Sequence, residues 1–156
     1  MSIKASISLL FSGEIKVKLV KLSQAVNTIS PSPFVLSDAT PPHITLFSFT
    51  SEDNDIRMPA KMYAVSFTGL MQLGDKGGRI WVAIGVNKTP GLEEFRKELI
   101  GATGTPKLER GEFIPHVTLA NVPAAEFDKI SAAIGATPLL KLAHTPCRTG
   151  RFIQPI

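Results

Sequence analysis

Two short stretches of the sequence repeat a pattern of residue types that can transfer protons. His43 is followed by Ile-Thr-Leu, and His116 is followed by Val-Thr-Leu. In a β-strand, residues two apart point to the same face, so each imidazole is expected beside a threonine hydroxyl, Thr45 or Thr118. With three histidines in the chain, two such matches arise by chance about once in a thousand sequences of this composition.

Two facing imidazoles suit acid–base chemistry near neutral pH. One can take a proton from water while the other gives a proton to a leaving oxygen. The hydroxyls of Thr45 and Thr118 can hydrogen-bond the non-bridging oxygens of a phosphate held between them. Such a site needs neither a metal nor a cofactor, and it suits attack of water on a phosphodiester, especially a strained cyclic one.

A structural explanation competes with this one. Isolated His-x-Thr segments occur in strands because threonine favours them and a histidine can bond to the backbone. The repetition of the motif at matching points of the chain favours a functional site, since paired titratable groups mark such sites.

The elements that must position the two motifs also form a repeat. Alternating apolar residues predict a strand at 3–11, and apolar residues three and four apart from Ile15 to Val26 predict a helix. A loop with four prolines follows at 30–42, and then the motif strand at 43–49. The same order is predicted again in residues 79–122.

The second half has clear boundaries of its own. A strand at 79–86 is followed by a helix that begins at Pro90 and runs to about Ile100. The second motif lies in a predicted strand at 112–122. The remaining predicted elements are a strand at 62–73, a hairpin turn at 74–78, a helix at 123–134 and final strands at 139–143 and 150–153.

This repeat predicts the fold class and the domain organisation. We expect one α+β domain spanning residues 1–156, with two lobes. Two antiparallel sheets, related by an approximate two-fold axis, would surround a central groove and carry their helices on the outside. Each half would then present its motif to the shared groove.

Composition narrows the class of protein. An apolar fraction of 44% with 19% charged residues is typical of a globular chain. No apolar run is long enough to predict a membrane span. The net charge of +4 favours anionic partners such as nucleotides or RNA, but the basic residues are too scattered for a duplex-binding track. We expect a monomer.

The single cysteine, Cys147, excludes an internal disulfide and predicts a reducing, cytoplasmic setting. His144 and Cys147 have a spacing that metal sites use. Because two further ligands are missing nearby, we expect no zinc site.

The paired motifs, 73 residues apart, resemble those of the 2H phosphoesterase superfamily. That group includes 2′-5′ RNA ligase-like proteins, cyclic phosphodiesterases acting on 2′,3′-cyclic ends, and viral or phage enzymes that cleave signalling oligonucleotides. The resemblance covers nearly the whole chain, and residues 115–121, PHVTLAN, carry it most clearly. It implies a bilobed fold with a central groove, metal-free hydrolysis, catalytic His43 and His116, and phosphate-binding Thr45 and Thr118.

Three functions fit these observations. The chain could hydrolyse 2′,3′-cyclic phosphate ends of nucleotides or RNA, degrade cyclic or 2′-5′-linked signalling oligonucleotides, or bind nucleotides or RNA without turnover. The presence of both histidines and both threonines favours the two enzymes over the binding module.

Further residues are candidates for substrate contacts. Trp81 shares a strand face with Arg79 and could stack on a base. Tyr63 and Phe47 are further stacking candidates. Arg148 and Arg151 flank Gly150 near the C-terminus and could bind a flanking phosphate.

Overall fold

The computed structural model describes residues 3–52, 58–104, 107–109 and 111–155 of the chain. These residues form one seven-stranded antiparallel sheet in the order β3-β7-β1-β2-β6-β5-β4. The elements in chain order are β1 (Ile3–Leu10), α1 (Gly13–Ile29), β2 (His43–Ser51), β3 (Met62–Val65), β4 (Phe67–Lys76), β5 (Arg79–Val86), α2 (Pro90–Ala102), β6 (His116–Pro123), η1 (Ala124–Glu126), α3 (Phe127–Ile134), η2 (Pro138–Lys141) and β7 (Thr145–Pro155).

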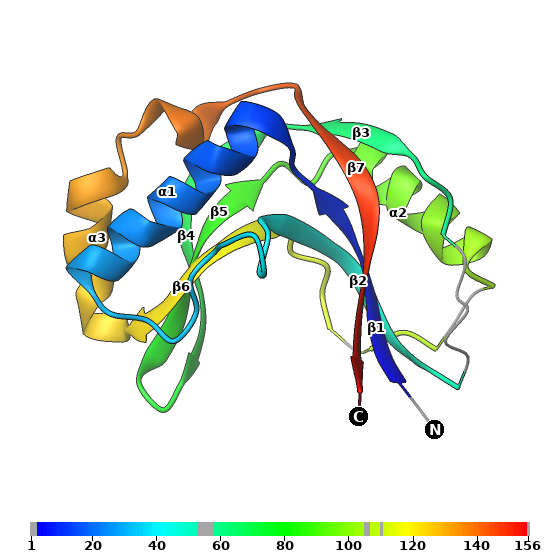
Figure 1. Ribbon diagram of the computed structural model, residues 1–156, viewed down its shortest axis with the longest axis horizontal. Coiled ribbons are helices and arrows are strands. Elements are labelled where there is room, and N and C mark those ends of the chain that lie inside the picture. Colours follow the sequence, from blue (N-terminus) through cyan, green and yellow to red (C-terminus); the bar gives the residue numbers. More distant parts are fainter. Residues whose placement is uncertain (1–2, 53–57, 105–106, 110, 156) are drawn as a thin grey trace.

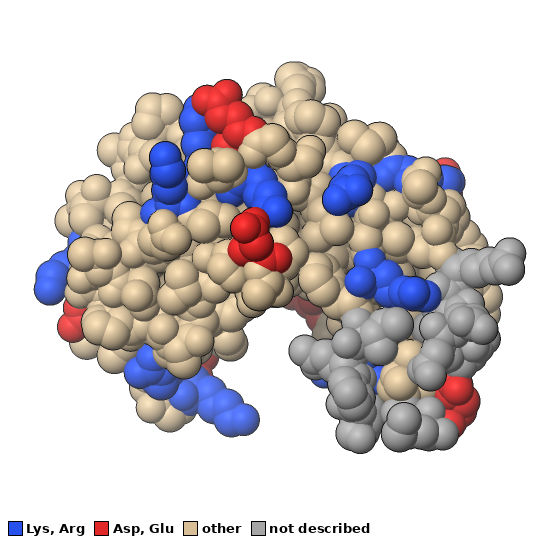
Figure 2. Space-filling view, in the orientation of Figure 1, with Lys and Arg blue, Asp and Glu red and all other residues tan. Residues whose placement is uncertain are grey.

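The sheet bends into an arch with two arms (Figure 1). Helices α1 and α3 cover the outside of the arm that contains β4, β5 and β6, and α2 covers the outside of the other arm. The inner face of the arch carries no helix in the described part of the chain, and the surface is deeply hollowed between the arms (Figure 2). The α+β class and the outer position of the helices are therefore confirmed.

The predicted repeat is present as β1-α1-β2 and β5-α2-β6. The helices cross between the halves, because α1 packs on β6 and α2 packs on β2. Each half thus depends on the helix of the other for its core. None of the described helices combines the length and the apolar composition needed to cross a bilayer.

The two halves pair at one position of the described chain, where Ile44 in β2 lies opposite Val117 in β6. Beyond this point the two strands diverge and bond to loops instead. The amide of Asn121 donates to Ser32 Oγ at 2.8 Å, and the amide of Glu109 donates to the carbonyl of Ser48 at 2.8 Å. The two sheets predicted from the sequence are therefore one sheet, joined through this pair.

Each motif strand contains a β-bulge at the same point. The register between β1 and β2 shifts so that Leu46 is the extra residue, and the register between β5 and β6 shifts at Leu119. A bulge leaves its extra residue outside the ladder, so its carbonyl needs another partner. The crossed helices supply it: Ser23 Oγ donates to the Leu119 carbonyl at 2.6 Å, and Arg96 Nε donates to the Leu46 carbonyl at 2.6 Å.

The core lies between the outer face of the sheet and the helices. Its fully buried members include Leu19 from α1, Leu99 from α2 and Ile130 from α3, which pack over Ile7, Ile44, Ile84 and Leu119 of the sheet. Burial of these branched side chains is the main favourable term that holds the helices on the sheet.

Four predicted strands differ from the structure. Residues 62–73 form parts of two strands, since β3 pairs with β7 whereas β4 pairs with β5. Residues 139–143 lie largely in the 3-10 helix η2, which begins at Pro138, and the last strand is longer than predicted. The second motif strand begins only at His116, because Pro115 has no N–H for the ladder.

The bond from Ser23 predicts a measurable loss of stability. Ser23 is buried, donates to the Leu119 carbonyl and accepts from the Leu36 amide at 2.9 Å. Ser23→Ala leaves both partners unsatisfied and should lower the free energy of unfolding by about 1–3 kcal/mol. Urea denaturation followed by circular dichroism measures it. Thr28→Ala, which removes an exposed hydroxyl of the same helix, is the control; equal effects of the two variants would contradict the assigned role.

Candidate active site

The pairing of Ile44 with Val117 brings the two motifs together. Each is the middle residue of its His-x-Thr segment, so in the antiparallel register His43 faces Thr118 and Thr45 faces His116 across the two strands. Ile44 and Val117 are buried on the outer side, which leaves the histidines and threonines on the groove face. The two histidines are diagonal neighbours, a relation that separates side chains by about 7–8 Å.

Both imidazoles are held by the same backbone contact. Nδ1 of His43 lies 2.8 Å from the Pro41 carbonyl, and Nδ1 of His116 lies 2.6 Å from the Ile114 carbonyl. A carbonyl oxygen only accepts, so Nδ1 must carry the proton in both residues. Nε2 is then the atom of each ring that can gain or lose a proton, and the repeated contact fixes the same tautomer twice.

His116 is biased towards the neutral form. Burial lowers the pKa of His116 below its ordinary value of 6.5, the hydrogen bond to Ile114 opposes this, and the positive charge of His43 lowers the pKa further. A neutral imidazole with Nδ1 protonated presents a basic Nε2 to the groove.

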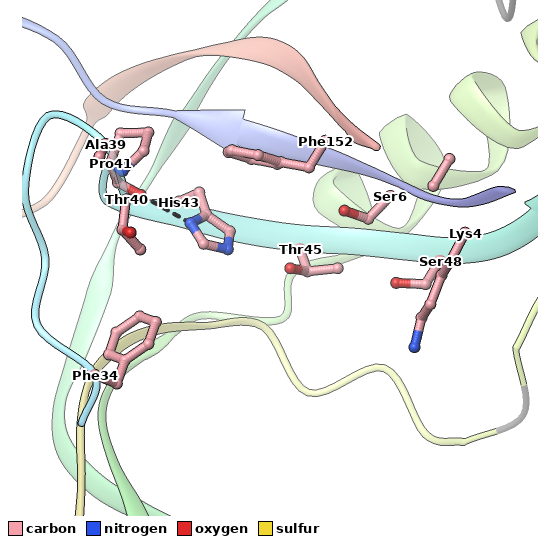
Figure 3. A pocket seen from close by; sticks show the side chains of 11 residues that line it. Lys4, Ser6, Phe34, Ala39, Thr40, Pro41, His43, Thr45, Ser48 and Phe152 are labelled. Carbon is pink, nitrogen blue, oxygen red and sulfur yellow. Dashed lines mark hydrogen bonds between the residues drawn. The ribbon is translucent and has the colours of Figure 1, made fainter. Parts of the chain in front are cut away.

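Two hollows lie along the groove on either side of Thr45. A hollow of about 420 Å³ contains His43 and Thr45, and a smaller one of about 200 Å³ contains His116 and Thr45. Ser48 also lines both. Figure 3 shows His43, Thr45 and Ser48 along β2, with Ser6 and Lys4 of β1 beside them, all directed into the larger hollow. The larger volume can hold a nucleotide-sized ligand.

Two aromatic residues of the larger hollow were not predicted from the sequence. The Phe152 ring packs on the His43 imidazole with centroids 4.8 Å apart, and Phe34 lines the opposite wall. Phe152 lies within the predicted strand at 150–153, but the sequence does not reveal that β7 pairs with β1. Phe34 comes from the proline-containing loop, where no periodicity indicates the direction of a side chain.

The bulges explain one further difference from the sequence prediction. Simple alternation places Phe47 on the face of His43 and Thr45, but the extra residue Leu46 reverses the parity. Phe47 is consequently almost wholly buried and packs on Phe49, while Ser48 turns to the groove. Phe47 is therefore not available for stacking. Asn121 takes the matching position after the bulge of the second motif.

The two aromatic candidates lie in different places. Trp81 is 41% exposed and meets the edge of Phe34, with ring centroids 5.6 Å apart. It therefore borders the groove. The ring of Tyr63 packs on Phe95 of α2, and its hydroxyl lies 3.3 Å from Thr89 at the start of that helix. Tyr63 is thus part of the outer layer.

Arg148 and Arg151 occupy opposite faces of β7. Arg151 pairs with Ile7, whose side chain is buried in the core, whereas Arg148 pairs with Leu10, which in turn lies beside His43. The strand register therefore places Arg148, but not Arg151, on the groove face. Neither lines the two hollows around Thr45.

Cys147 lies outside the site. Its thiol is buried in the core, where burial raises its pKa to about 12. A protonated, buried thiol is a poor metal ligand and a poor nucleophile. The neighbouring His144 is exposed, at a backbone φ of 54°.

The family model of the 2′-5′ RNA ligase superfamily matches residues 34–145, which include both motifs. The chain belongs to this superfamily of 2H phosphoesterases. The resemblance carried by the two His-x-Thr motifs is thereby confirmed.

Solved structures show the same fold. Usb1 of Kluyveromyces marxianus aligns with a TM-score of 0.51 at 13% identity, over 99% of this chain and 98% of that one. A second structure, of the same protein with uridine monophosphate, gives the same values. No curated protein matches the sequence.

The lowered pKa of His116 predicts how stability depends on pH. As the pH falls below 6.5, the unfolded chain binds a proton at residue 116 that the native chain resists, so the free energy of unfolding decreases. His116→Asn should flatten this acid-side slope. His144→Asn, at an exposed histidine, is the matched control and should leave the slope in place. Urea titrations between pH 5 and 8, a range of about three units around the histidine pKa, measure the free energy of unfolding. An unchanged slope in His116→Asn would show that His116 is not biased towards the neutral form.

Proposed function

We propose that this 2H phosphoesterase is a metal-independent phosphodiesterase that hydrolyses 2′,3′-cyclic phosphate ends of nucleotides or RNA by paired-histidine acid–base catalysis. The observation that carries the proposal is the pairing of Ile44 with Val117, because it sets two imidazoles and two hydroxyls around one space. Proton transfer and oxygen binding are then both supplied by side chains.

We assign the role of the base to His116. Its lowered pKa favours the neutral ring, whose Nε2 can take a proton from water. The resulting hydroxide attacks phosphorus, the bond from phosphorus to one ribose oxygen breaks, and Nε2–H of His43 protonates that oxygen. His43 ends neutral and His116 ends protonated, so a proton must return through solvent before the next turnover.

In this proposal Thr45 and Thr118 bind the phosphate. Each threonine lies across the strands from the histidine of the other motif, on the groove face. Donors fixed before the reaction stabilise charge that develops on the non-bridging oxygens. The smaller hollow contains Thr45 and His116 together, which supports this arrangement.

The comparisons support a nucleotide or RNA substrate. Superfamily membership favours phosphodiester chemistry on nucleic acids, and a structure of similar fold carries uridine monophosphate. The two alternative functions, a nuclease of signalling oligonucleotides and a non-catalytic binding module, would use the same groove. The nuclease would hydrolyse a different diester, and the binding module would hydrolyse none.

Removing either imidazole should abolish most turnover. His43→Ala and His116→Ala are each expected to lower kcat by roughly 10²–10⁴-fold, and the double variant should lose far less than the product of these factors, because acid and base act in one transition state. The assay is single-turnover hydrolysis in EDTA of nucleoside 2′,3′-cyclic phosphates, 2′-5′ oligoadenylates and cyclic dinucleotides. His144→Ala is the control.

Threonine variants refine the same test. Thr45→Ala and Thr118→Ala should cost about 1–3 kcal/mol in the barrier, and serine at either position should restore most of it. Turnover of only the 2′-5′ or cyclic dinucleotide substrates would favour the nuclease. Tight binding of nucleotides with no turnover would favour the binding module, and a strict need for added metal would contradict the mechanism.

A further inference from the structure

The two arms of the groove carry a basic residue at the same register position. Arg79 of β5 lies opposite Pro123, seven residues after His116, and Lys4 of β1 lies opposite Thr50, seven residues after His43. Arg79 lies two residues before Trp81, the partner of Asn121, and Lys4 lies two residues before Ser6, the partner of Ser48. Both basic side chains are therefore on the groove face. The repeat has thus placed a cation at each end of the groove.

The two cations differ in the charge of their partners. Lys4 forms an ion pair with Glu109 at 2.8 Å. Arg79 instead donates from Nε to the Asn121 side-chain oxygen and from Nη2 to the Asn121 carbonyl, both at 2.8 Å. Both partners are uncharged, so within the described chain the guanidinium keeps its full positive charge. Two of its five donors are used, and three remain for a ligand.

Asn121 holds this guanidinium in one orientation. The amide of Asn121 is itself bonded to Ser32 Oγ at 2.8 Å, and its side chain lies beside Arg79 on the groove face. A guanidinium fixed by two bonds loses little freedom when it binds an anion, and its fork matches the oxygens of a phosphate. Figure 2 shows Lys and Arg side chains gathered at the tip of the arm that carries the β4–β5 hairpin.

Trp81 supplies an aromatic surface between this cation and the site. It pairs with Asn121 across the strands, is 41% exposed and is supported at its edge by Phe34, which lines the hollow of His43. Asn121 is the third residue after Thr118 along the strand, a distance of about 10 Å or less. One nucleotide can bridge that span.

We propose that Arg79 and Trp81 form a subsite for the nucleotide next to the reacting phosphate. Arg79 binds a second phosphate, Asn121 positions the guanidinium, and Trp81 stacks on the intervening base. The inference rests on the proposed function for the position of the first phosphate and narrows its substrate class. The favoured substrates carry at least two phosphates, as oligonucleotide ends do, rather than one, as cyclic mononucleotides do.

The test uses Trp81 as its own probe, since it is the only tryptophan of the chain. Fluorescence titrations compare adenosine 3′-monophosphate with adenosine 3′,5′-bisphosphate. Both should quench Trp81, and the bisphosphate should bind at least about tenfold more tightly, as a charge-assisted hydrogen-bonded contact provides. Arg79→Gln should abolish this preference, Asn121→Ala should reduce it and Arg79→Lys should retain part of it.

Lys129→Gln is the matched control, because it removes one positive charge from the exposed side of α3. It should keep the preference. Equal affinity of the wild type for both ligands, or a preference that survives in Arg79→Gln, would overturn the subsite. Circular dichroism checks that each variant is folded. If Arg79→Gln does not fold, the reduced preference expected of Arg79→Lys still tests the subsite.

Binding and turnover measured separately distinguish this inference from the proposed function. Binding requires no turnover, so a bisphosphate preference that depends on Arg79 in a protein without hydrolytic activity would leave the subsite standing and reject the proposed reaction. Equal kcat/KM values for a cyclic mononucleotide and for a dinucleotide with a cyclic end would support the reaction and reject the subsite.

Discussion

The pairing of Ile44 with Val117 is the contact on which the rest of the site depends. It is the one position in the described chain where the two halves of the sheet meet, and it lies between the histidine and the threonine of both motifs. Because the partners on either side of this pair are fixed by antiparallel geometry, each histidine must lie across from the threonine of the other motif. The groove results from the divergence of the same two strands beyond that point.

The bulges and the crossed helices keep this contact in place. Each motif ends in an extra residue, Leu46 or Leu119, whose carbonyl is bonded by a side chain from the helix of the opposite half. The outer layer thus ties both arms to the centre of the sheet. On the groove face the same bulges turn Ser48 and Asn121 inward, so the polar lining continues outward from His43 and His116.

The sequence predicted the parts of this design that depend on local pattern. The His-x-Thr spacing, the apolar alternation of β1 and the helix that begins at Pro90 all depend on neighbouring residues, and the structure agrees with them. Phe47 was misplaced because a bulge reverses strand parity without a sequence signal. Phe152 and Phe34 were missed because their positions depend on long-range pairing and on a loop. Arg148 and Arg151 are three residues apart, so the alternation of a strand predicts that they lie on opposite faces. Which of the two faces lines the groove depends on the pairing of β7 with β1.

Nitrogen-15 NMR of the imidazoles can determine directly whether Nε2 of both histidines is the atom that faces the groove and exchanges the proton. In the His144→Asn variant, the two remaining histidines should both be neutral in the Nδ1–H tautomer at high pH, because each Nδ1 is bonded to a carbonyl. On acidification the proton should arrive at Nε2 of each ring. A neutral ring protonated at Nε2 in either histidine would contradict the arrangement of acid and base described here.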